Sequence, residues 1–280
     1  MSFARNEQQT YDHFLWTDTG IYDGDPIRPL AIDEALATSM GKTDVHPLIH
    51  LWVCDRALFL GRRDAKLPFL QQTLRTFGKA GYRAVLRSSG GACVPLDLGV
   101  LNLAIHLPGT SVPIDDFFQL AASLLTSGLH DYGTIAIGEV TGSYCVGDYD
   151  FAINGKKIGG MAQRRTRHGS ILQLCINVEP DHRGDLMALF YEQAGLAEMT
   201  AAKPIPSIDA NTVSSLSAET SRFVCVAAVK NKLFSALEAE WRLTPASLDL
   251  AETEIETARI HLQQKLGLFS YTAQQLAEEN

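Results

Sequence analysis

The chain has 280 residues, of which 46% are hydrophobic and 20% are charged, a composition typical of folded globular proteins. Its 32 acidic residues outnumber the 24 lysines and arginines, which gives a formal net charge of −8. Non-specific binding to nucleic acid or to an anionic membrane favours a basic surface, so this balance argues against both functions.

The first part of the chain alternates between helical and strand patterns. Two segments have apolar residues at helical spacing with proline or glycine near their ends, and a third begins with acidic residues, which is typical of a helix start. These predicted helices are residues 29–40, 67–80 and 115–130. Short apolar runs bounded by turn residues predict strands at 48–54, 57–60, 83–87 and 100–107.

The second part begins with a hairpin signal and then becomes helical. Asn154-Gly155 separates two predicted strands, 150–153 and 157–163, and this dipeptide is a strong hairpin signal. A further strand is predicted at 171–178, followed by helices at 184–194, 220–238 and 248–267. We therefore predict an α+β fold with mixed β-sheets packed against helices. We expect a single domain over residues 1–280, with its core at about 29–180 and a mainly helical extension at 184–280.

The five cysteines are scattered singly and show neither a CxxC pair nor zinc-ligand spacing, so no metal site is predicted. The N-terminal residues lack the apolar run of a signal peptide, and no stretch approaches 18 consecutive apolar residues. These features lead us to expect a cytoplasmic protein whose thiols stay reduced.

Cys145 has the most unusual surroundings of these thiols. It lies between Gly142 and Gly147, and residues 151–170 carry five basic side chains and no acidic one. Nearby cations favour the reactive thiolate form of cysteine, whereas an isolated cysteine is most often a small core residue. Context alone leaves both roles open for Cys145 and favours the core role for Cys54, Cys93, Cys175 and Cys225.

The Gly90-Gly91 turn is similarly open to two interpretations. It lacks the Gly-Lys-Ser/Thr ending of a P-loop and the spacing of a dinucleotide-binding motif. It is either a plain turn between strands or a backbone cradle beside a narrow ligand. Arg87, at the end of the strand before this turn, could simply extend to solvent.

Three motifs in order resemble those of the lipoate-protein ligase superfamily. Residues 87–92 (RSSGGA), followed by Asp97, resemble its glycine-rich motif. Residues 154–164 (NGKKIGGMAQR) and 168–172 (HGSIL) resemble the two motifs that follow. The resemblance covers residues 29–180 and implies a catalytic domain like those of biotin and lipoate ligases.

Residues 142–150 (GSYCVGDYD) narrow this resemblance further. They are similar to the GSYCPGxYD motif of the octanoyl-[glycine cleavage H protein]:protein N-octanoyltransferases, with Val146 in place of proline. Leu96 stands where the ligases have a histidine before the aspartate, which argues against ATP-dependent activation. The resemblance implies octanoyl transfer from H protein to lysines of lipoyl domains in the E2 subunits of 2-oxoacid dehydrogenases. It implies no cofactor and no metal.

Three alternatives to this activity stay open. The chain could transfer octanoyl groups from acyl carrier protein, or it could be an ATP-dependent lipoate-protein ligase. It could also be a non-catalytic module that binds lipoyl domains.

The resemblance also implies roles for individual residues. Cys145 would form an acyl thioester, and Lys157, with its ammonium about 4–6 Å from the sulfur, would stabilise the thiolate and polarise the acyl carbonyl. Lys156 would point to the opposite face of the strand, where the basic hairpin could dock acidic lipoyl domains. Ile158 and Met161 would line an acyl slot. The expected substrate-binding residues are Arg87, Ser89, Gly90, Gly91, Asp97, Gly160, Ala162 and His168.

Overall fold

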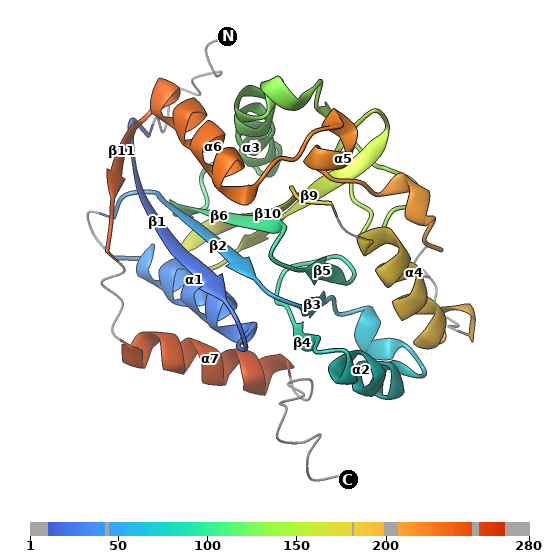
Figure 1. Ribbon diagram of the computed structural model, residues 1–280. Helices are drawn as coiled ribbons and strands as arrows, with labels where there is room; N and C mark the ends of the chain where they lie inside the picture. Colours follow the sequence, from blue (N-terminus) through green and yellow to red (C-terminus); the bar gives the residue numbers. More distant parts are fainter. Residues whose placement is uncertain (1–10, 43–44, 181, 199–206, 248–251, 267–280) are drawn as a thin grey trace.

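The computed structural model describes residues 11–42, 45–180, 182–198, 207–247 and 252–266. Its largest element is an eight-stranded mixed sheet with the order β11-β1-β2-β6-β10-β9-β8-β7 (Figure 1). In that order the strands are Arg242–Pro245, His13–Tyr22, Leu48–Cys54, Val100–Pro108, Gly169–Asn177, Lys156–Arg165, Asp150–Ile153 and Ala136–Ile137. β1 is parallel to both of its neighbours, and the pairs from β2 to β7 are antiparallel.

A smaller sheet has the order β4-β3-β5. Its strands are Arg83–Leu86, Ala57–Leu60 and Val94–Leu96. β3 runs parallel to β4 and antiparallel to β5. The turn between β4 and β5 contains the Gly90-Gly91 pair, so this sheet positions the glycine-rich segment.

Helices cover both faces of the large sheet (Figure 1). α3 and α6 pack with one face in the main apolar cluster, whereas α1 packs on the other face, with α7 against it. α2 and α4 pack beside the small sheet in a further cluster, and α5 is a short helix before α6. The bounds are α1 Ile27–Ser39, α2 Leu70–Lys79, α3 Ile114–Gly128, α4 Arg183–Gln193, α5 Leu216–Thr220, α6 Val226–Glu240 and α7 Glu252–Leu266.

β6 shows why the central strands have nearly continuous apolar sequences. Leu101, Leu103, Ile105 and Leu107 belong to the cluster with α3 and α6, while Val100 belongs to the cluster with α1. Side chains alternate between the two faces of a strand, and helices cover both faces here. The strand therefore needs apolar side chains at most positions.

The α+β prediction is confirmed, and the predicted strands 48–54 and 57–60 coincide with β2 and β3. β1, β5, β7 and β11 were not predicted. The helix predicted at 220–238 is wrong at its start, because α5 ends at Thr220 and α6 begins only at Val226. For the helix predicted at 248–267, residues 248–251 and 267 lie outside the described residues, and α7 occupies the part between them. No helix in the described ranges has the length and apolarity needed to cross a membrane.

Candidate active site

Cys145 lies in the loop between β7 and β8, and its backbone is unusual. Its φ of +49° places it in the left-handed region, which is uncommon for a residue other than glycine and requires support from its surroundings. That support comes from Lys157 on β9. The Lys157 ammonium donates hydrogen bonds to the carbonyl oxygens of Cys145 at 3.0 Å and of Tyr144 at 2.8 Å.

Lys157 is itself deeply buried, with its side chain 3% exposed, and it forms an ion pair of 2.8 Å with Oδ1 of Asp150. An ammonium has three donors, and these three oxygen atoms can occupy all of them. Burial raises the pKa of Asp150, an effect that the neighbouring charge of Lys157 opposes. The pair therefore fixes the loop around Cys145 from the side of its main chain.

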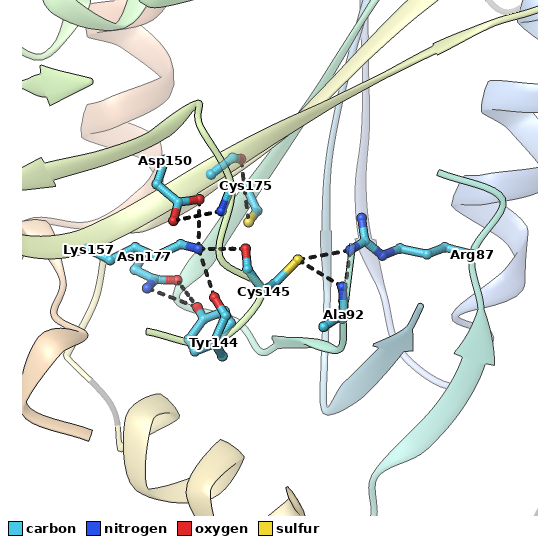
Figure 2. Close-up of polar contacts among 10 residues, drawn as sticks. Arg87, Ala92, Tyr144, Cys145, Asp150, Lys157, Cys175 and Asn177 are labelled. Carbon is cyan, nitrogen blue, oxygen red and sulfur yellow. Dashed lines mark hydrogen bonds and ion pairs between the residues drawn. The ribbon is translucent and has the colours of Figure 1, made fainter. Parts of the chain in front are cut away.

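The sulfur atom of Cys145 points to the opposite side, towards the turn after β4 (Figure 2). It accepts hydrogen bonds from Nη2 of Arg87 at 3.1 Å and from the main-chain N–H of Ala92 at 3.3 Å. The cation in contact with the sulfur is therefore Arg87. Lys157, which the sequence predicted for this place, contacts the carbonyl oxygen of the same cysteine instead.

A cavity of about 230 Å³ opens beside this sulfur. Ligand pockets for drug-sized molecules have roughly 300–1,000 Å³, so this cavity suits a smaller or narrower group. Its apolar lining includes Leu30, Trp52, Phe59 and Met161. The cavity can therefore hold an apolar chain whose reactive end lies at Cys145.

The small residues predicted on β9 contribute directly to this space. Gly160 lies opposite Cys175 on β10, and Ala162 lies opposite Gln173. All four residues line the cavity. The predicted wall residue Met161 is also there, but Ile158 is not: it is fully buried in the cluster with α3 and α6. Ile158 follows Lys157, and adjacent side chains of a strand point to opposite faces. A register irregularity between Lys157 and Gly159 then brings Gly160 and Ala162 back to the cavity face.

Most of the predicted substrate-binding residues meet at this cavity, and two do not. Those that line it together with Cys145 and Lys157 are Arg87, Ser89, Gly90, Gly91, Gly160 and Ala162. Asp97 instead accepts hydrogen bonds from the Arg183 guanidinium, with 2.7 Å between Nε and Oδ2. His168 is exposed in the turn between β9 and β10, beside Gly41. Asp97 and His168 therefore lie outside the lining of this cavity, and their role in substrate binding stays a prediction.

A buried polar cluster at the cavity was not predicted. The carboxylate of Asp33 on α1 accepts hydrogen bonds from His50 at 2.8 Å, His106 at 3.2 Å and Gln173 at 2.6 Å. Burial alone would raise the pKa of Asp33, but the hydrogen bonds from His106 and His50 outweigh it and hold the pKa below its ordinary value. Asp33 and Gln173 both line the cavity. The only sequence signal was the presence of single polar residues inside apolar patterns.

Cys175, which the sequence placed in the core, also lines the cavity. Burial raises the pKa of this thiol, so it is less suited than an activated cysteine to act as a nucleophile. No group of three or more metal-ligating side chains is arranged to hold a metal ion among the described residues.

The basic hairpin is largely neutralised by its neighbours. Lys156 lies 3.7 Å from Glu219, and Arg164 lies 2.7 Å from Glu34. Arg165 donates to two main-chain carbonyls. The hairpin therefore presents less free positive charge for docking than its sequence suggests. As predicted, the two lysines face opposite sides, since Lys156 is half exposed and Lys157 is buried.

Comparisons with known proteins identify the family and the fold of this chain. The family model described as the lipoyl protein ligase A/B catalytic domain matches residues 25–238. The chain is 37% identical over 253 residues to an "Octanoyl-[GcvH]:protein N-octanoyltransferase" of Anoxybacillus flavithermus, covering 89% of this chain and 91% of that protein. It is 32% identical to a "Lipoyl-[GcvH]:protein N-lipoyltransferase" of Listeria monocytogenes, covering 81% and 85%. A crystal structure of lipoate-protein ligase A bound with ATP has the same fold, with a TM-score of 0.65, 19% identity and coverage of 91% and 95%.

Proposed function

Since the chain belongs to the family of lipoyl protein ligase A/B catalytic domains, we propose that it transfers octanoyl groups from the glycine cleavage H protein to lysines of E2 lipoyl domains. Relatives named for octanoyl transfer from GcvH support the donor and the reaction class. The observation that carries the proposal is the Cys145 sulfur, which accepts two hydrogen bonds beside a narrow, largely apolar cavity.

The reaction proceeds in two acyl transfers. The Cys145 thiolate attacks the carbonyl carbon of the octanoyl amide on the donor lysine; a C–S bond forms, the C–N bond breaks, and the departing amine takes up a proton. A deprotonated lysine of the acceptor then attacks the thioester; a new C–N bond forms, the C–S bond breaks to release the thiolate, and the nitrogen gives up one proton, which balances the proton taken up in the first transfer. One amide replaces another, so the exchange needs no ATP.

The surroundings of Cys145 support each step. The apolar side chains of the cavity receive the hydrocarbon chain, and its burial there provides binding energy of roughly 0.8 kcal/mol per methylene. Lys157 and Asp150 hold the main chain of Cys145 in its left-handed conformation. This conformation directs the sulfur towards Arg87 and Ala92 rather than towards the lysine.

Intact-mass spectrometry tests this proposal. The protein is incubated separately with octanoyl-H protein, with octanoyl-acyl carrier protein and with free octanoate, each with and without ATP, and then with an acceptor lipoyl domain. We expect one octanoyl adduct on Cys145 from octanoyl-H protein without ATP, its transfer to the acceptor lysine, and no adduct on Cys145→Ser.

Each other outcome overturns the proposal in a different way. An adduct only from acyl carrier protein would assign the other transferase activity. Acceptor modification that requires ATP and a free acid, and survives Cys145→Ser, would assign a ligase. No acyl group on the enzyme or the acceptor under any condition would assign a non-catalytic binding module.

A further inference from the structure

Arg87 makes contacts that a purely structural arginine does not need. It is only 8% exposed, and its Nη2 donates both to the Cys145 sulfur at 3.1 Å and to the carbonyl oxygen of Ala92 at 2.7 Å. Nη1 donates to the hydroxyl oxygen of Ser89 at 3.2 Å. The Nε–H is also buried and has no partner among the described residues. A buried donor without a partner is energetically costly, and this one belongs to a residue that lines the cavity.

We propose that Arg87 and the Ala92 N–H form a single anion site, which first holds the Cys145 thiolate and then the oxyanion of the tetrahedral intermediate. The oxyanion half of this inference rests on the proposed function, because it requires Cys145 to attack a carbonyl group. The thiolate half does not rest on it.

The chemistry connects the two anions. As the C–S bond forms, the negative charge passes from the sulfur to the carbonyl oxygen, and both atoms are bonded to the same carbon. Donors that contact the sulfur are therefore close to the place where the oxyanion develops. The Nε–H of Arg87 supplies a third donor that the resting site leaves unused. Positioned donors of this kind stabilise the transition state because they need little reorganisation when the charge moves.

Lys157 has a different role in this arrangement. Its ammonium contacts three oxygen atoms, two of them main-chain carbonyls and one the Asp150 carboxylate. It acts on the reacting sulfur through the backbone of Cys145 and is a positioning residue. Arg87 touches the reacting atom and is a catalytic residue.

The first test measures the rate at which iodoacetamide alkylates Cys145 at pH 7 in the full chain without an acyl donor. Peptide mass spectrometry separates Cys145 from the other four cysteines. In Arg87→Gln this rate should fall by about tenfold or more, because the sulfur loses its cationic neighbour. Arg83→Gln is the matched control, because Arg83 begins the strand that leads to Arg87 and pairs with Asp23 instead. Its alkylation rate should equal that of the parent protein.

The second test measures the rate of thioester formation from octanoyl-H protein. Loss of an oxyanion donor typically lowers this kind of rate by about 10²- to 10³-fold, and we expect that loss in Arg87→Gln. Arg87→Lys keeps the positive charge but replaces the separate guanidinium nitrogens with a single ammonium nitrogen. We expect it to keep more of the parent's alkylation rate than Arg87→Gln does, and its thioester rate still to be lowered by about tenfold or more.

Thermal unfolding of each variant shows whether it is folded. If Arg87→Gln does not fold, Arg87→Lys decides by its thioester rate. A folded Arg87→Gln with the alkylation rate and the thioester rate of the parent, or failing that an Arg87→Lys with the thioester rate of the parent, would overturn the inference. Slower alkylation in Arg87→Gln, with no thioester in the parent from any donor, would instead remove the proposed function and leave only the thiolate half of the anion site.

Discussion

Gly91 offers a direct test of whether the turn after β4 positions the Cys145 sulfur. Its φ is +98°, and a Cβ atom added there would lie 2.6 Å from Nη2 of Arg87 and 2.6 Å from the Cys145 sulfur. Both clashing atoms are ends of side chains, so they can move apart while the main chain stays in place. Gly91→Ala should therefore disrupt the contact between Arg87 and the sulfur without unfolding the protein.

Gly109 supplies the matched control. Its φ is +68°, and an added Cβ would meet nothing within 4 Å. Both alanine variants carry the strain of a left-handed residue, about 1–3 kcal/mol, and only Gly91→Ala carries the clash. Urea unfolding should give similar losses of stability for the two. Alkylation of Cys145 at pH 7 should fall about tenfold or more in Gly91→Ala alone, because the sulfur is displaced from its cationic neighbour. Equal alkylation rates in both variants would refute a positioning role for the turn.

Two further predictions concern buried charges. Lys157→Met leaves the Asp150 carboxylate buried without its partner and should lower the free energy of unfolding by about 3–5 kcal/mol. Lys156→Ala removes a half-exposed lysine from its ion pair and should lower it by less than about 1 kcal/mol. Equal losses in urea unfolding would contradict the separate roles of the two lysines. Burial raises the pKa of Asp64 from 3.8 to about 6, so the folded state binds its proton more tightly than the unfolded state and stability falls as pH rises from about 4 to 6. Relative to Asp64→Asn, the parent protein should lose about 2 kcal/mol between pH 4 and 6 and about 3 kcal/mol over the whole titration. Parallel stability curves for the two would show that the Asp64 pKa is not raised.

Strands with both faces covered can be predicted from their continuous apolar sequences. β2 and β6 are almost entirely buried, and their apolar sequences reflect that environment. β1 was not recognised because its sequence, HFLWTDTGIY, mixes polar residues and glycine, and most of its residues are only partly buried. β11 is short, mostly exposed and contains proline. Its strand geometry comes from parallel pairing with β1, a partner more than 200 residues earlier in the chain.

The polar cluster around Asp33 could not be predicted for a related reason. Asp33 lies on α1, while His50, His106 and Gln173 lie on three different strands. These strands are brought together by the register of the sheet, in which Ala104 lies opposite both His50 and Gln173. The Asp33 carboxylate thus connects α1 to β2, β6 and β10 through hydrogen bonds. The fixed geometry of the cavity depends on residues that no local sequence pattern connects.

The residues at the reactive centre could be predicted, but the contacts of their atoms could not. Sequence similarity placed Cys145, Lys157 and the Gly90-Gly91 turn at one site, and the structure brings them together. Cys145, with its φ of +49°, presents its carbonyl oxygen to Lys157 and its sulfur to Arg87. A hairpin argument brings a lysine near a cysteine residue without specifying which atom it meets. The two cations therefore have separate roles, because Lys157 holds the main chain while Arg87 contacts the reacting sulfur.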